Sequence, residues 1–185
     1  MKKLFYVLGT SVLFACNDTA KDGVNSAGGT VKDSTTAVDN TTYPYTASYS
    51  SKFEMGSTKD AEHVLAFWKD FDNGTIANSR DILADSVTVM FSDGTTFSGP
   101  RDSAVKDAQS YRDMFASVTS NVEAWIPLRA TDKNENWVGI WGWEKHTGKD
   151  GKIDSVHLHE IWRMNSAGKA DFIMQFTAKQ PPAKK

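Results

Sequence analysis

The last third of the chain alternates between apolar and polar residues over four successive segments, and this pattern restricts the fold most. The segments are NVEAWIPLRA at 121–130, NWVGIWGWEKHT at 136–147, IDSVHLHEIWRMN at 153–165 and KADFIMQFTA at 169–178. A period of two residues is typical of strands that bury one face, so Val122, Ala124, Ile126 and Leu128 of the first segment are expected to share a face. GKDG separates the second and third segments and is typical of a hairpin turn. We therefore expect consecutive antiparallel strands.

Helical periodicity precedes these strands. A first helix is expected to begin after Ser57, a candidate N-cap, and to end at Asn73-Gly74. IANSRDILAD at 76–85 predicts a short helix, and after a strand around 86–91 a longer amphipathic helix is predicted over 101–118. The apolar residues of that helix recur at helical spacing: Ala104, Ala108, Tyr111, Phe115 and Val118. Helices followed by antiparallel strands indicate the α+β class.

The hairpin around GKDG decides which side chains share a face. A loop of two or four residues makes the numbers of paired residues sum to an odd value. Trp141 and Trp143 would then lie beside Glu160 on an aromatic face. His157 and His159 would lie on the opposite face.

The N-terminus has the layout of a signal peptide at residues 1–15. Lys2 and Lys3 precede an apolar run that is too short to span a bilayer. The run ends in LFAC, which resembles a bacterial lipobox, and Cys16 is the only cysteine. We expect Cys16 to be acylated, with palmitate among its fatty acids, and to anchor the protein in the membrane of the cell envelope, the outer membrane being favoured. The alternative is an ordinary signal peptide with an incidental cysteine.

Composition defines the remaining organisation. Residues 16–51 are rich in Ser, Thr and Asn and predict a flexible tether, whereas 52–180 predict one domain and 181–185 a polar tail. The net charge is −2 and basic residues are dispersed, so we expect no nucleic-acid partner. The sequence contains no phosphate-binding loop and no nucleophile elbow. We therefore expect no cofactor.

Two segments carry a family resemblance. ILADSVTVMFSDGTTFSG at 82–99 and EIWRMNSAGKADFIMQF at 160–176 resemble the nuclear transport factor 2-like superfamily, which includes SnoaL-like polyketide cyclases and ketosteroid isomerases. The resemblance covers about residues 58–178. It implies a cone-like curved antiparallel sheet, wrapped around a long helix and two N-terminal helices, and a homodimer formed through the convex sheet face. Glu160 matches a pocket aspartate of ketosteroid isomerase, but Phe67 and Phe91 replace its other polar groups, so steroid isomerisation is not implied.

A candidate site follows from this arrangement. Glu160 is expected to serve either as a general acid or base of raised pKa or as a structural carboxylate. His157 and His159 could bind a metal, with His146 or Glu144 of the neighbouring strand as further ligands, but we prefer a semi-polar convex face and expect no metal site. The residues expected to line the pocket are aromatic or apolar: Phe67, Trp68, Phe91, Tyr111, Trp141, Trp143, Trp162, Met174 and Phe176.

Three functions remain open. The first is a lipoprotein module that binds a small apolar or ring-shaped molecule, with Glu160 holding its polar end. The second is a SnoaL-like isomerase or cyclase that uses Glu160 as general acid or base. The third is a structural accessory lipoprotein whose pocket is filled by its own side chains.

Overall fold

The computed structural model describes residues 42–179, so the predicted signal peptide, Cys16 and the tail from 180 lie outside the described residues. Within this part the chain forms seven strands, two α-helices and one 3-10 helix. In chain order they are β1 (Phe53–Met55), α1 (Thr58–Asn73), η1 (Ile76–Ile82), β2 (Leu83–Met90), β3 (Thr96–Pro100), α2 (Arg101–Arg112), β4 (Phe115–Ala130), β5 (Glu135–Gly148), β6 (Ile153–Met164) and β7 (Ala170–Lys179). None of the helices within 42–179 combines the length and apolar character needed to cross a bilayer.

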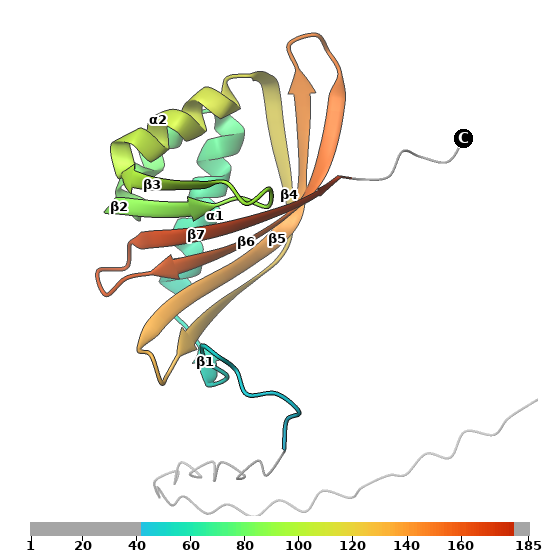
Figure 1. Cartoon of the computed structure of the whole chain (residues 1–185). Helices are drawn as coiled ribbons and strands as arrows, with labels where there is room; N and C mark the ends of the chain where they lie inside the picture. The colour runs from blue at the N-terminus through green and yellow to red at the C-terminus, as the bar shows by residue number, and fades with distance from the viewer. Residues whose placement is uncertain (1–41, 180–185) are drawn as a thin grey trace, which may run out of the picture. The chain divides into compact units, whose positions relative to one another are not determined.

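All seven strands form one sheet in the order β1-β4-β5-β6-β7-β2-β3. Only β2 and β7 pair in parallel among these strands; every other neighbouring pair is antiparallel. The strands β4 to β7 curve, and α1 and α2 lie on one side of the sheet (Figure 1). The α+β class and the cone-like sheet are therefore confirmed.

Helix α1 packs its apolar face against the sheet and ends at a glycine. Ala61, Val64 and Trp68 are buried at helical spacing. Gly74 adopts φ 72°, a left-handed conformation that suits glycine and ends the helix. The Arg112 guanidinium donates hydrogen bonds to the carbonyl oxygens of Phe71 and Asp72 at the helix end, and the Phe71 oxygen also accepts from the Gly74 N–H. Ser57 occupies the N-cap position, but its side chain makes no capping hydrogen bond.

Two predicted helix boundaries are wrong. Helix α2 ends at Arg112, and the residues from Phe115 to Val118, predicted to be helical, belong to β4. A bulge between Phe115 and Ser117 lets the side chains of Phe115 and Val118 both turn toward the core. These two apolar residues are therefore three positions apart, a spacing that is also typical of a helix. The segment predicted as a short helix over 76–85 is a 3-10 helix that ends at Ile82, and β2 begins at Leu83.

The pairing predicted for the β5–β6 hairpin is also wrong. Gly148 and Lys152 close the loop through a backbone hydrogen bond, so three residues separate them, and Gly151 adopts φ 79°. An odd loop makes paired numbers sum to an even value, and Trp141 lies opposite His159 while Trp143 lies opposite His157. Residues directly opposite in an antiparallel pair share a face. The two tryptophans therefore share the face of the histidines.

Strand β4 contains a second bulge, which reverses the face of its apolar residues. Val122 pairs with Gly142, but Ala124 pairs with Trp141, so Glu123 is the extra residue. Val122 thus packs against the core, whereas Ala124 and the residues two and four positions later lie on the opposite face. The predicted single face for Val122, Ala124, Ile126 and Leu128 is wrong because the alternation shifts by one residue at the bulge.

Candidate functional site

A cavity of about 740 Å³ lies between the helices and the concave face of the sheet. Its wall combines residues of α1 and α2 with residues of β2, β5, β6 and β7. This size is within the range of pockets that enclose small molecules. The open space argues against the alternative in which the protein's own side chains fill the pocket.

Five of the predicted pocket residues do line this cavity. They come from both helices, from the end of β2 and from β6: Phe67, Trp68, Phe91, Tyr111 and Trp162. Phe67 packs edge-on against Trp162, with ring centroids 5.1 Å apart. Trp162 is 1% exposed and belongs to the core, so it forms a fixed base for the cavity.

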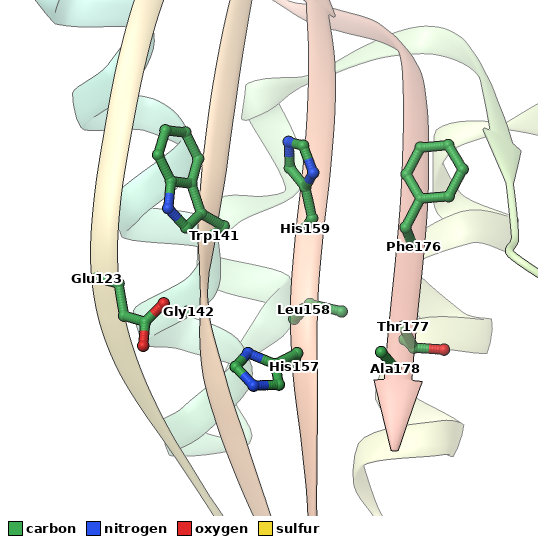
Figure 2. Close-up of a pocket in the computed structure, with 9 residues that line it drawn as sticks. All are labelled: Glu123, Trp141, Gly142, His157, Leu158, His159, Phe176, Thr177 and Ala178. Atoms are coloured by element: carbon green, nitrogen blue, oxygen red, sulfur yellow. The ribbon is translucent and has the colours of Figure 1, made fainter. Parts of the chain in front are cut away.

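The other four predicted pocket residues lie on the outer, convex face. Trp141, His159 and Phe176 form one row across β5, β6 and β7, and Trp143 pairs with His157 in the next row. Figure 2 shows Trp141, His159 and Phe176 projecting from the face of the strands opposite to the helices. Met174 shares the face of Phe176, as their spacing predicted, but that face is the outer one.

Glu160 lies at the cavity wall within a network of N–H donors. The indole N–H groups of Trp68 and Trp162 donate to Oε2 at 2.6 and 2.8 Å, and the Gln175 amide donates to Oε1 at 2.7 Å. Glu160 is 5% exposed, and none of its hydrogen-bond partners within 42–179 is a cation. Burial raises the pKa of Glu160, although the three N–H donors counteract this rise.

Sequence reasoning missed a second polar group in the cavity. Glu144 and His146 on β5 both line it, and His146 Nε2 is hydrogen-bonded to Glu144 Oε1. Each residue is less than a tenth exposed. The sequence Glu144-Lys145-His146 indicated that the glutamate and the histidine share a face, because residues two apart on a strand lie on the same side. The error in the hairpin register concealed which face that was.

Acidic residues outnumber basic residues around the cavity. Besides the two glutamates, Asp93, Asp107 and Asp154 line it, whereas Lys179 is its only lysine or arginine within the described residues. Burial, followed by the charges of Glu144 and Asp154, raises the pKa of the Tyr111 phenol. Tyr111 therefore keeps its proton at neutral pH.

The two histidines predicted as outside candidates for a metal site lie away from the cavity. His157 and His159 line a shallow groove on the outer face together with Glu123 (Figure 2). Glu144 and His146, considered as further ligands, face the cavity instead. Within 42–179 no group of three or more His, Cys, Asp or Glu side chains could hold a metal ion.

Solved structures of known proteins share this fold. An NTF2-like protein of unknown function from Exiguobacterium sp. 255-15 matches with a TM-score of 0.53 and 14% identity, over 64% of this chain and 99% of the other. A protein described as a SnoaL-like polyketide cyclase from Jannaschia sp. CCS1 gives 0.53 and 14%, over 65% and 85%. An LEH-like epoxide hydrolase from M. tuberculosis gives 0.55 and 8%, over 66% and 84%.

No family sequence model matches the chain, and no curated protein sequence matches it. At 8 to 14% identity the structural neighbours show the NTF2-like, SnoaL-like fold and nothing finer. The fold implied by the resemblance is confirmed. Function has to be inferred from the cavity itself.

Proposed function

We propose that this NTF2-like domain binds a small, uncharged, mainly apolar molecule in its helix–sheet cavity. The observation that carries the proposal is the aromatic lining of a cavity of about 740 Å³, in which rings come from α1, α2, β3, β4 and β6. Flat aromatic walls favour a ring-shaped ligand, because stacked and edge-on contacts then add to the burial of apolar surface. Gln175 and Glu160 supply polar contacts that orient the ligand.

The charge of the wall restricts the ligand further. Five carboxyl groups and a single lysine line the cavity within the described residues, and such a wall repels anions. A carboxylate or phosphate ligand would also leave water for a cavity without a matching arginine. A neutral ligand avoids both the repulsion by the carboxyl groups and the loss of hydration of a charged group.

A lipid anchor in the cell envelope and a dimer are further parts of the proposal. We propose that acylated Cys16 attaches the protein to a membrane of the envelope, on the strength of the LFAC segment and the preceding charged and apolar residues. We also propose that two copies pair through the convex face. Trp141, Phe176 and Met90 leave apolar surface exposed there, between 37% and 45% of each residue.

Binding of a neutral dye and of an anionic dye tests the proposal. The neutral dye Nile red and the anionic dye 1-anilinonaphthalene-8-sulfonate would be titrated against the full chain, and we expect saturable binding of the neutral dye only. Ala108→Phe fills the cavity from α2 and should weaken Nile red binding at least tenfold. Ser103→Phe adds the same side chain on the exposed face of α2 and is the matched control. Equal binding by both variants would refute the proposed site.

A further inference from the structure

The strongest unassigned feature of the cavity is the pair formed by Glu144 and His146. Alternation along β5 turns both side chains to the concave face, while Trp143 and Lys145 turn outward. The two residues are 7% and 6% exposed, so their hydrogen bond is shielded from bulk water. A buried carboxylate paired with an imidazole is a costly arrangement, and such pairs are frequent at functional sites.

Aromatic neighbours fix the orientation of the imidazole. The Phe115 ring stacks on His146 with centroids 4.3 Å apart and an interplanar angle of 21°. The Tyr111 ring meets His146 edge-on at 6.4 Å and 89°. Contacts on two sides and the bond to Glu144 hold the ring in one orientation, which a catalytic side chain requires.

The hydrogen bond also decides which ring nitrogen is free. A carboxylate oxygen can only accept, so Nε2 of His146 is the donor to Glu144 Oε1, and in the neutral form of the ring the lone pair is then on Nδ1. Nδ1 makes no hydrogen bond to any residue within 42–179. A neutral imidazole with a free nitrogen beside an apolar cavity has the properties of a general base.

We propose that His146, oriented by Glu144, is a general base that removes a proton from carbon on a neutral molecule bound in the cavity. This inference rests on the proposed binding function. The substrate class is an uncharged compound whose C–H bond is activated by a neighbouring carbonyl or similar group. The proton passes to Nδ1 of His146, and the electron pair of the C–H bond moves toward the activating oxygen. The Tyr111 hydroxyl, which lines the same cavity, donates a hydrogen bond to the oxygen that gains charge.

A probe that needs only a base and an apolar site tests this step. In 5-nitrobenzisoxazole, a neutral ring compound, removal of the C–H proton forms a C≡N bond and breaks the N–O bond, whose electron pair stays on the phenolate oxygen. The coloured phenolate reports the rate on the full chain, and quenching of tryptophan fluorescence reports binding, because Trp68 and Trp162 lie in the cavity wall.

The variants separate the base from the fold. His146→Gln retains an N–H donor for Glu144 but has no basic nitrogen, and we expect kcat to fall about 100-fold with KM unchanged. Glu144→Gln removes the acceptor that orients the ring and should lower kcat about tenfold at unchanged KM. His157→Gln removes a histidine from the outer face and should leave the rate unchanged.

Each result bears on the proposal. Binding that saturates, with a rate indifferent to His146→Gln, overturns the general base and leaves the binding function intact. Failure of the probe to bind, together with failure of Nile red to bind, overturns both. A rate that falls equally in His157→Gln and His146→Gln places the reaction outside the cavity and also overturns the inference.

Discussion

Removal of the Glu160 carboxyl should destabilise the fold, chiefly because two buried indole N–H groups lose their hydrogen-bond acceptor. Trp162 and Trp68 are 1% and 5% exposed, and both donate to the same oxygen. Glu160→Met keeps a side chain of similar length but replaces the carboxylate oxygens with a thioether sulfur, which is only a weak acceptor. A buried donor without an acceptor costs about 1–3 kcal/mol, and relief from burying the carboxyl offsets part of the sum. We expect a loss of about 3 kcal/mol in the free energy of unfolding.

Glu160→Gln is the matched comparison for this prediction. The glutamine oxygen can accept both indole N–H groups, and the Gln175 amide can rotate by half a turn to accept from the new amide. The loss should therefore stay below about 1 kcal/mol. Urea denaturation of the three proteins, followed by circular dichroism, measures the difference. If Glu160→Met and Glu160→Gln were equally stable, the indole network would have no role in stability.

Three other predictions follow from single contacts. Burial raises the pKa of Glu160, so the stability of the wild type relative to Glu160→Gln should be greatest below about pH 4.5 and should fall as pH rises through the folded pKa, by at most about 1.4 kcal/mol per pH unit. Urea titrations at several pH values measure this difference, and a rise with pH would contradict the prediction. Gly142→Ala should lower the free energy of unfolding by about 2 kcal/mol or more, because a Cβ there would lie 2.3 Å from a backbone oxygen of β4. In Gly139→Ala the new Cβ would lie 3.4 Å from a side-chain methyl, so the loss should stay under about 1 kcal/mol, and thermal unfolding compares the two variants. Trp141→Glu on the convex face should convert a dimer to a monomer in sedimentation, whereas Trp125→Glu, on the other face, should leave the mass unchanged; an unchanged mass for Trp141→Glu would refute pairing through the convex face.

Much of the architecture was predictable because it depends on local patterns. The spacing of Ala61, Val64 and Trp68 and the stop at Gly74 located α1. Alternation located the four long strands, although the helical spacing of Phe115 and Val118 hid the start of β4. The position of Glu160 among aromatic residues was also recognised, but with different partners. Trp68 and Gln175, from α1 and β7, complete its network, and the sequence does not indicate that these three elements meet at one point.

The sequence alone determined which residues share a face within β5 and within β6, because side chains alternate with a period of two. In β4 the bulge at Glu123 broke this alternation. The sequence did not determine how a face of one strand relates to the next strand. GKDG is compatible with loops of two, three or four residues, and one residue more or less moves every side chain to the other face. Only the folded hairpin, with three residues between Gly148 and Lys152, turned Trp141 outward and Glu144 and His146 inward. The tertiary structure therefore decided the composition of the cavity, because strand register depends on the loop and on packing across the whole sheet.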